Sequence, residues 1–128
     1  MRLLLDTCVF LWLAWEPNRI SAIAAAAIDD SRNDLLLSHA SVWEIYLKCQ
    51  TGKLKLPQGP RRWVGRQLAV RGVKGWAIDL ESLDATLDLG NHHRDPFDRL
   101  LVAQSKVHSL TLVSPDPWLK KYRPAILW

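Results

Sequence analysis

An apolar run that ends on a carboxylate, Arg2-Leu3-Leu4-Leu5-Asp6, opens the 128-residue chain. Three consecutive leucines without alternation are typical of a strand buried on both faces, as found in parallel sheets covered by helices. Similar apolar runs occur at residues 35–37 and 110–113, with long helical patterns between them. We therefore predict an α/β fold with a central, mostly parallel sheet of four to five strands and helices on both faces.

Helical patterns fill the intervals between these strands. We expect helices over residues 8–15, 22–30, 39–50, 61–71, 81–89 and 97–108. Ser21 is a suitable N-cap for the second of them, and Pro60 fits the first turn of the fourth. A weak strand within residues 73–80 and a small one at 125–127 complete the order. The length suits one domain spanning residues 1–128.

Composition is that of an ordinary globular domain, because 48% of the residues are hydrophobic and 23% are charged. The net charge of +4 suits a polyanionic partner such as RNA, although many other proteins carry as much. Cys8 and Cys49 have no metal-binding spacing, which favours two buried free thiols in a reducing compartment. Asp6 interrupts the apolar start, and no run reaches the roughly 20 residues of a membrane span. We expect a cytoplasmic protein with no membrane contact.

Four acidic residues are placed to meet at one edge of the predicted sheet. Asp6 ends the first strand, and Asp116 lies just beyond the last long one. Asp98 opens the helix before that strand, and Glu44 lies in the second turn of the helix after residues 35–37. In open parallel sheets, strand ends and helix starts share one edge, where ligands bind.

Each acid also has a purely structural interpretation. Asp6 can cap the helix that follows it, and Glu44 can pair with Lys48 four residues later. Asp95-Pro96-Phe97-Asp98 and Asp116-Pro117 resemble ordinary helix starts. Four carboxylates at one edge would nevertheless repel one another unless a cation lies among them. Hard oxygen ligands without cysteine favour Mg²⁺, with Mn²⁺ as a substitute, and paired divalent ions can promote phosphodiester hydrolysis.

Four segments of the chain resemble PIN domains of the VapC toxin kind. They are Leu4-Leu5-Asp6-Thr7-Cys8-Val9-Phe10-Leu11-Trp12, Ser38-His39-Ala40-Ser41-Val42-Trp43-Glu44-Ile45, Arg94-Asp95-Pro96-Phe97-Asp98-Arg99-Leu100-Leu101-Val102-Ala103-Gln104, and Leu110-Thr111-Leu112-Val113-Ser114-Pro115-Asp116. The segments occur in the family's order and span residues 1 to about 120. The third is the most specific of them.

This resemblance implies an Mg²⁺-dependent endoribonuclease, the toxin of a type II toxin–antitoxin pair. Such a protein acts as a homodimer and is silenced by a small cognate antitoxin. The metal-binding and catalytic acids would be Asp6, Glu44, Asp98 and Asp116, with Asp6 and Asp98 foremost. Ser114 would support the site through its hydroxyl group, and Asp95 would cap its helix or hold an outer water. The sequence departs from the family at Cys8, where a His is common, and at Ser114, where a Thr is usual.

Several basic and aromatic residues are candidates for contacts with partners. Arg94 and Arg99 flank the most specific acidic segment, and Arg62 and Arg66 share one helix face, so these four are candidates for RNA binding. The adjacent His92 and His93 point in different directions, which favours solvent exposure over a shared metal. The tryptophans at positions 12 and 15 favour core packing, with an antitoxin groove or dimer contact as the alternative.

Three other interpretations remain open. One is a catalytically silent PIN-like module that binds RNA or protein, and another is a PIN nuclease of RNA processing that has no antitoxin. A receiver-like phosphoacceptor domain has similar length and layering. That fold requires an acidic pair after its first strand and a lysine on a late strand, and the sequence offers neither.

Overall fold

The computed structural model describes every residue of the chain, from Met1 to Trp128. Five strands form one sheet in the order β3-β2-β1-β4-β5, and all four neighbouring pairs are parallel. The strands are β1 (Arg2–Leu5), β2 (Asp34–Ser38), β3 (Val73–Trp76), β4 (Thr111–Val113) and β5 (Ile126–Leu127). The predicted α/β class is confirmed. Receiver-like domains have the order 2-1-3-4-5, so the strand order excludes that alternative.

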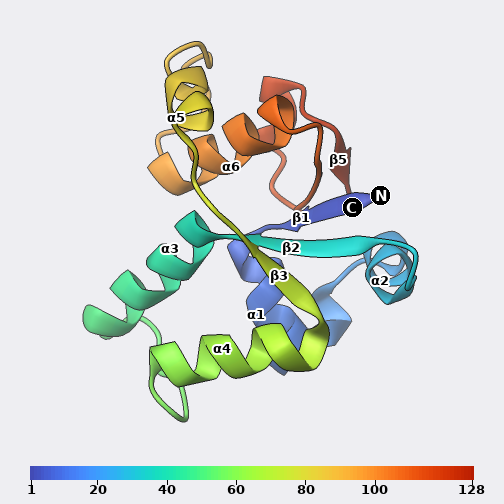
Figure 1. Cartoon of the computed structure of the whole chain (residues 1–128), viewed down its shortest axis with the longest axis vertical. Coiled ribbons are helices and arrows are strands. Elements are labelled where there is room, and N and C mark those ends of the chain that lie inside the picture. The colour runs from blue at the N-terminus through green and yellow to red at the C-terminus, as the bar shows by residue number, and fades with distance from the viewer.

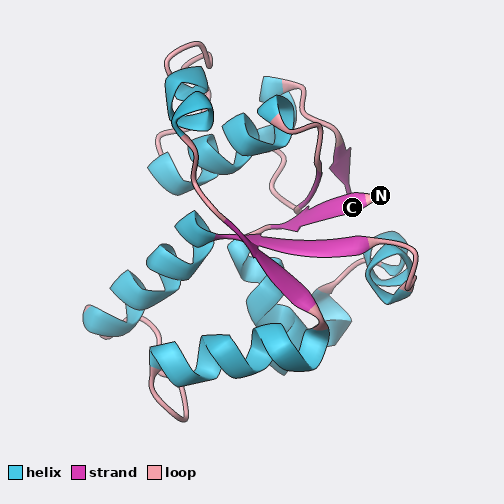
Figure 2. Cartoon of the chain, in the orientation of Figure 1, coloured by secondary structure: helices cyan, strands magenta, loops and turns pink.

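Six helices cover the two faces of the sheet (Figures 1 and 2). They are α1 (Thr7–Trp15), α2 (Ala22–Asp29), α3 (His39–Gln50), α4 (Pro60–Arg71), α5 (Leu80–Thr86) and α6 (Pro96–Val107). Figure 1 shows α5 and α6 on one side of the sheet and α1, α3 and α4 on the other. Two short 3₁₀ helices, η1 (Pro17–Arg19) and η2 (Leu119–Tyr122), were not predicted.

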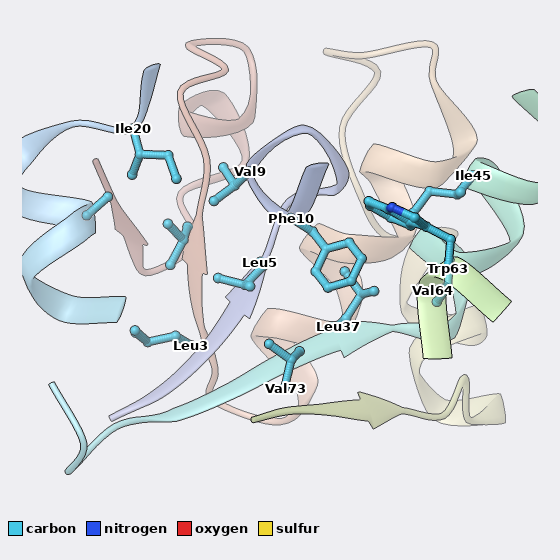
Figure 3. Close-up of a cluster of buried hydrophobic side chains, with 12 residues drawn as sticks. Leu3, Leu5, Val9, Phe10, Ile20, Leu37, Ile45, Trp63, Val64 and Val73 are labelled. Atoms are coloured by element: carbon cyan, nitrogen blue, oxygen red, sulfur yellow. The ribbon is translucent and has the colours of Figure 1, made fainter. Parts of the chain in front are cut away.

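The leucines of β1 divide the interior into two cores. Leu3 and Leu5 belong to a cluster with side chains of α1, α3 and α4 (Figure 3), whereas Leu4 faces α6 and η2. All three leucines are fully buried. Burial of a leucine contributes roughly 1.5–3 kcal/mol. The unalternating run is therefore explained by a central strand that is covered on both faces.

Aromatic side chains fill the first core and explain why α1 has no polar face. Phe10 packs edge-on against Trp63 at 6.0 Å between ring centroids, and Trp15 stacks on the same indole at 4.9 Å. Trp12 lies beneath the Arg19 guanidinium, 4.1 Å from the ring centroid. Core packing thus accounts for Trp12 and much of Trp15, although Trp15 remains 43% exposed.

Some predicted boundaries differ from the observed ones. The strand expected within residues 73–80 ends at Trp76, and the following helix, α5, stops at Thr86 instead of reaching residue 89. Leu80, Leu83 and Leu87 are exposed, so their helical spacing does not mark a face buried in the core. No helix of the chain is long and apolar enough to cross a membrane.

Parallel pairing brings the ends of β1 and β4 together. The Asp6 backbone N–H donates to the Val113 carbonyl oxygen at 2.9 Å, so the ladder continues one residue past β1. Residues that follow these central strands therefore lie side by side although more than a hundred positions separate them in sequence. The acidic residues gather at this edge of the sheet.

Candidate metal centre

Asp6 lies at the junction of β1 and α1. It occupies the N-cap position, but its side chain makes no capping hydrogen bond. Instead, its Oδ2 accepts a 2.6 Å hydrogen bond from the Ser114 hydroxyl group. The Ser114 oxygen in turn accepts from the Asp116 backbone N–H at 3.1 Å. Asp6 is only 7% exposed. It is therefore a buried carboxylate that does not cap α1.

Asp98 is carried by the first turn of α6. The N-cap of this helix is Asp95, whose Oδ1 accepts from the Phe97 N–H at 2.9 Å, and Pro96 occupies the first helical position. The predicted cap at Asp95 is therefore confirmed. Because the cap fixes where the helix begins, it also fixes the direction of the Asp98 carboxylate, whose side chain is 15% exposed.

The other two acids reach the same edge from different elements. Glu44 is buried in α3, and its Oε2 lies 3.5 Å from the Lys48 ammonium nitrogen, which is the predicted i, i+4 pair. Asp116 follows β4, where its Oδ1 accepts from the Trp118 N–H at 2.9 Å. The Asp116 side chain is 25% exposed, more than that of Asp98.

One cleft of about 250 Å³ joins these side chains. Carboxylates dominate its wall, and Lys48 is its only basic residue. The lining consists of Asp6, Thr7, Cys8, Leu11, Glu44, Lys48, Asp95, Asp98 and Asp116. The structure thus brings all four predicted acids together, with Asp95 beside them.

The electrostatics of the cleft disfavour full ionisation. Burial, and then repulsion by Asp6 and Asp95, raise the pKa of Asp98 to about 8. Burial also raises the pKa of Asp6, and the Glu44 and Asp116 charges add to this effect. Since each carboxylate makes its neighbours harder to ionise, the cluster favours either a retained proton or a bound cation.

The two cysteines are free, as predicted, but both are half-buried instead of fully buried. Burial, with repulsion from Asp6 and Asp98, raises the pKa of the Cys8 thiol to about 12. The sulfur therefore remains a neutral thiol in the cleft wall at physiological pH. Burial and the neighbouring carboxylates thus disfavour a Cys8 thiolate in the metal-free cleft.

His93 is a site residue that the sequence analysis missed. Its Nε2 lies 3.1 Å from Asp98 Oδ2 and 3.2 Å from Asp116 Oδ2, and its side chain is only 21% exposed. The expectation of solvent exposure is correct for His92 and wrong for His93. Adjacent histidines do point differently, and one of the two turns into the acidic site. Its position two residues before the Asp95 cap was the available signal.

The predicted basic residues have different surroundings. Arg94, Arg62 and Arg66 are exposed. The Arg99 guanidinium instead donates hydrogen bonds within the chain, to the Gly90 and Thr86 carbonyl oxygens and to the hydroxyl group of Tyr122. Arg99 therefore ties α6 to the end of α5 and to η2.

Comparison with known proteins matches this geometry to a family. The PIN domain family model matches residues 3–123. Ribonuclease VapC22 of Mycobacterium tuberculosis is 30% identical over 130 residues, covering 98% of this chain and 97% of the relative. The chain belongs to the PIN-domain family, in its VapC group.

Solved structures share the fold of this PIN domain at lower sequence identity. VapBC2 from Rickettsia felis, bound to a DNA fragment from its promoter, matches with a TM-score of 0.72 and 14% identity, over 98% of this chain and 97% of that one. A toxin–antitoxin complex from Klebsiella pneumoniae matches with a TM-score of 0.60 and 14% identity, over 96% and 93%. The resemblance that the acidic segments suggested is confirmed.

Proposed function

We propose that this PIN domain is a metal-dependent endoribonuclease and the toxin of a type II toxin–antitoxin pair. The convergence of Asp6, Glu44, Asp98 and Asp116 on one cleft is the observation that carries the proposal. The name of its M. tuberculosis relative, a ribonuclease, gives the substrate class. Because all four carboxylates are present and gathered, an active nuclease fits better than a silent binding module.

The side chains of the cleft suit a divalent cation. Its acidic donors are hard oxygens, which Mg²⁺ and Mn²⁺ prefer. Burial, and then the neighbouring carboxylates, raise the pKa of Asp6 and of Asp98, and a bound cation would offset both effects. Thr7 lines the cleft, and its buried hydroxyl group has no hydrogen-bond partner in the chain. A bound Mg²⁺ would polarise the phosphodiester and lower the pKa of an attacking water.

The acids take graded roles in this proposal. Asp6 and Asp98, the two with raised pKa values, would be the principal ligands. Ser114 holds Asp6 by its hydroxyl group and so fixes one ligand in place. Glu44 would complete the set and orient the attacking water. Asp116 already accepts a hydrogen bond from the Trp118 N–H through Oδ1. It would therefore support the site as a secondary ligand.

RNA would approach the cleft from its exposed basic surroundings. Arg94 lies one residue before the Asp95 cap and is exposed, so it is the first candidate for a phosphate contact. Arg62 and Arg66 on α4 offer further positive charge. Arg99 is a weaker candidate than Arg94, because its guanidinium is already bonded to the chain.

We further propose a small cognate antitoxin, a homodimeric assembly and a cytoplasmic location. The solved structures that share the fold include a toxin–antitoxin complex and VapBC2, which supports a partner of this kind. Expression of the chain with the small open reading frame next to its gene tests the partner. We expect a stable complex and suppression of RNA cleavage. A protein that neither binds this product nor slows growth when expressed alone would favour a role in RNA processing.

The enzymatic proposal is tested with purified protein, a labelled RNA and Mg²⁺. We expect cleavage that stops on addition of a chelator and in the Asp98→Asn variant. Asp29→Asn is the matched control, since Asp29 is an exposed aspartate on α2 away from the cleft. Cleavage by Asp98→Asn at the rate of Asp29→Asn would contradict the proposed site.

A further inference from the structure

His93 lies between two acids of the proposed metal site. Its Nε2 is 3.1 Å from Asp98 Oδ2 and 3.2 Å from Asp116 Oδ2. The two carboxylates come from different elements, the start of α6 and the segment after β4. The His93 ring is the one group that contacts both carboxylates by a hydrogen bond or an ion pair.

The other ring nitrogen of His93 determines where its proton lies. Nδ1 accepts a hydrogen bond from the Asp95 backbone N–H at 3.0 Å. A backbone amide is always a donor, so the nitrogen that faces it carries no hydrogen. The proton of the neutral imidazole is therefore on Nε2, where it donates to Asp116 Oδ2 and lies close to Asp98 Oδ2.

We propose that His93 is a positioning residue that holds Asp98 and Asp116 for the cation through its Nε2–H and is not itself a metal ligand. The inference rests on the proposed function, because it presumes that the acids bind a divalent ion. In this role His93 acts as a hydrogen-bond donor because its Nε2 carries the ring proton.

The same geometry disfavours direct coordination by His93. Its Nε2 and one oxygen from each of Asp98 and Asp116 lie within 4.8 Å of one another, a spacing that also suits three metal ligands. Coordination through Nε2 would require the proton on Nδ1. Nδ1–H and the Asp95 N–H would then face each other at 3.0 Å, and a hydrogen bond would become a contact between two donors.

A buried tyrosine from the far end of the chain fixes the loop that carries His93. The Tyr122 hydroxyl oxygen accepts the backbone N–H groups of His92 and His93 at 3.1 and 2.6 Å. Arg99 donates to the same oxygen at 3.2 Å and to the Gly90 carbonyl at 2.9 Å. His93 is therefore held at two points. Tyr122 binds the His93 backbone N–H, and the Asp95 backbone N–H binds the His93 ring.

A fixed donor shared by two acids has a clear consequence for metal binding. It holds the Asp98 and Asp116 side chains at one spacing before the cation arrives. Hydrogen-bonding partners behind metal ligands typically change metal affinity by roughly 10–100-fold when they are removed. We expect a loss of this size from His93 without the loss of any ligand.

The test is a titration with Mn²⁺ in which the free ion is followed by electron paramagnetic resonance. His93→Ala should weaken Mn²⁺ binding by about 10–100-fold. His93→Gln should restore most of the affinity, since its side-chain amide brings an N–H close to the position of Nε2. His92→Ala is the matched control, because the neighbouring imidazole is exposed, and it should bind as the wild type does. Equal affinities for His93→Ala and the wild type, or for His93→Gln and His93→Ala, would overturn the inference.

Nitrogen-15 NMR of the wild-type histidine rings tests the tautomer without a substitution at the site. The His93 signals are assigned by their absence from His93→Gln. We expect a protonated Nε2 and a bare Nδ1, unchanged on saturation with Mg²⁺. A proton on Nδ1, or loss of the Nε2 proton when Mg²⁺ binds, would identify a direct ligand and contradict the inference.

Different results would contradict the metal site and the role of His93. A wild-type protein that binds no Mn²⁺ would overturn the metal site, and the inference with it. Wild-type binding that disappears in Asp98→Asn but is unchanged in His93→Ala would leave the site intact and overturn the role of His93 alone.

Discussion

Among single residues, Asp98 has a carboxyl group whose ionisation is strongly disfavoured by its surroundings. Its carboxylate is mostly buried, and the nearby charges of Asp6, Asp95, Glu44 and Asp116 all raise its pKa, to about 8. Such clustering reduces the stability of the folded chain in exchange for a place where a cation is strongly attracted. Activity and stability should therefore respond in opposite directions to its removal.

Asp98→Asn tests this opposition. The amide keeps the shape of the side chain and removes its charge, so the metal-free protein should become more stable at about pH 8 by several kcal/mol, since one pKa unit corresponds to about 1.4 kcal/mol. RNA cleavage should fall by more than the roughly 10–100-fold typical of residues behind a metal ligand. Thermal unfolding in chelator and a cleavage assay measure the two effects. A variant that is both less stable and fully active would refute this reading of Asp98.

The dependence of stability on pH follows from the same carboxylate. In the unfolded chain Asp98 ionises near its ordinary pKa of 3.8, whereas in the folded chain it keeps its proton up to about pH 8. Between these values unfolding releases a proton, so rising pH favours the unfolded state. The metal-free protein should lose stability across this window, and Asp6 acts in the same direction.

Denaturant unfolding at a series of pH values checks this prediction. The comparison is between wild type and Asp98→Asn, because the pKa values of Asp30 and Asp79 are lowered and act in the opposite direction in both proteins. The stability advantage of the variant should grow from about pH 4 to about pH 8. Two profiles that stay parallel over this range would be evidence against a raised pKa at Asp98.

The sequence predicted the gathering of the acids better than their hydrogen bonding. Asp6, Glu44, Asp98 and Asp116 follow strand ends and helix starts, which topology alone assigns to one edge. His93 was missed because its direction depends on Tyr122, 29 positions later, and on the Asp95 backbone. The position of His93 two residues before the Asp95 cap was a local signal, but it does not show which way the ring points.

At the scale of elements, the start of α6 connects chain architecture with the site. Asp95 caps the helix through its side chain and fixes His93 through its backbone N–H. At the same helix, buried Gln104 accepts from the Ser38 hydroxyl group and donates to the Ala77 carbonyl oxygen. These bonds tie α6 to the ends of β2 and β3, so the helix that carries Asp98 is fixed along its length.

Asp95→Ala should weaken the protein mainly through its lost cap. Substituting alanine at an N-cap costs about 1 kcal/mol, and Asp95→Ser should recover most of it, because serine also caps well. RNA cleavage should fall less than in Asp98→Asn. The measurements are denaturant unfolding and cleavage at saturating Mg²⁺. A loss of cleavage equal to that of Asp98→Asn, with stability unchanged, would make Asp95 a metal-site residue instead of a cap.

Element boundaries were predicted where capping chemistry marks them and missed where it does not. Ser21 and Asp95 accept the backbone N–H groups at the starts of α2 and α6, as their types suggested. The end of α5 at Thr86 has no such marker, and the exposed Leu87 imitated a continuing helix. The two 3₁₀ helices were missed because so short a turn leaves no periodicity to detect.

At the scale of the whole molecule, the central strand supports both cores and the site. β1 has α1, α3 and α4 on one face and α6 on the other, and it ends on Asp6 (Figures 1 and 3). Any loosening of this strand moves the carboxylate relative to Asp98. Stability and metal binding are therefore coupled through β1.

Leu4→Ala tests this coupling. The side chain is fully buried beneath α6, so its truncation should cost about 2–5 kcal/mol. Mn²⁺ affinity should fall as well, since the strand that positions Asp6 is loosened. Val70→Ala, at an exposed apolar position on α4, is the control and should change neither property. If Leu4→Ala is less stable but binds Mn²⁺ with wild-type affinity while folded, stability and metal binding are not coupled through β1.

Anomalous diffraction can locate the metal and so determine whether Asp6 and Asp98 bind it. Crystals grown with Mn²⁺ should show an anomalous peak in the cleft, within bonding distance of carboxylate oxygens of Asp6 and Asp98, and this peak should be lost in Asp98→Asn. A peak elsewhere on the chain, or none at a Mn²⁺ concentration that supports RNA cleavage, would contradict the assignment of these acids as the metal site.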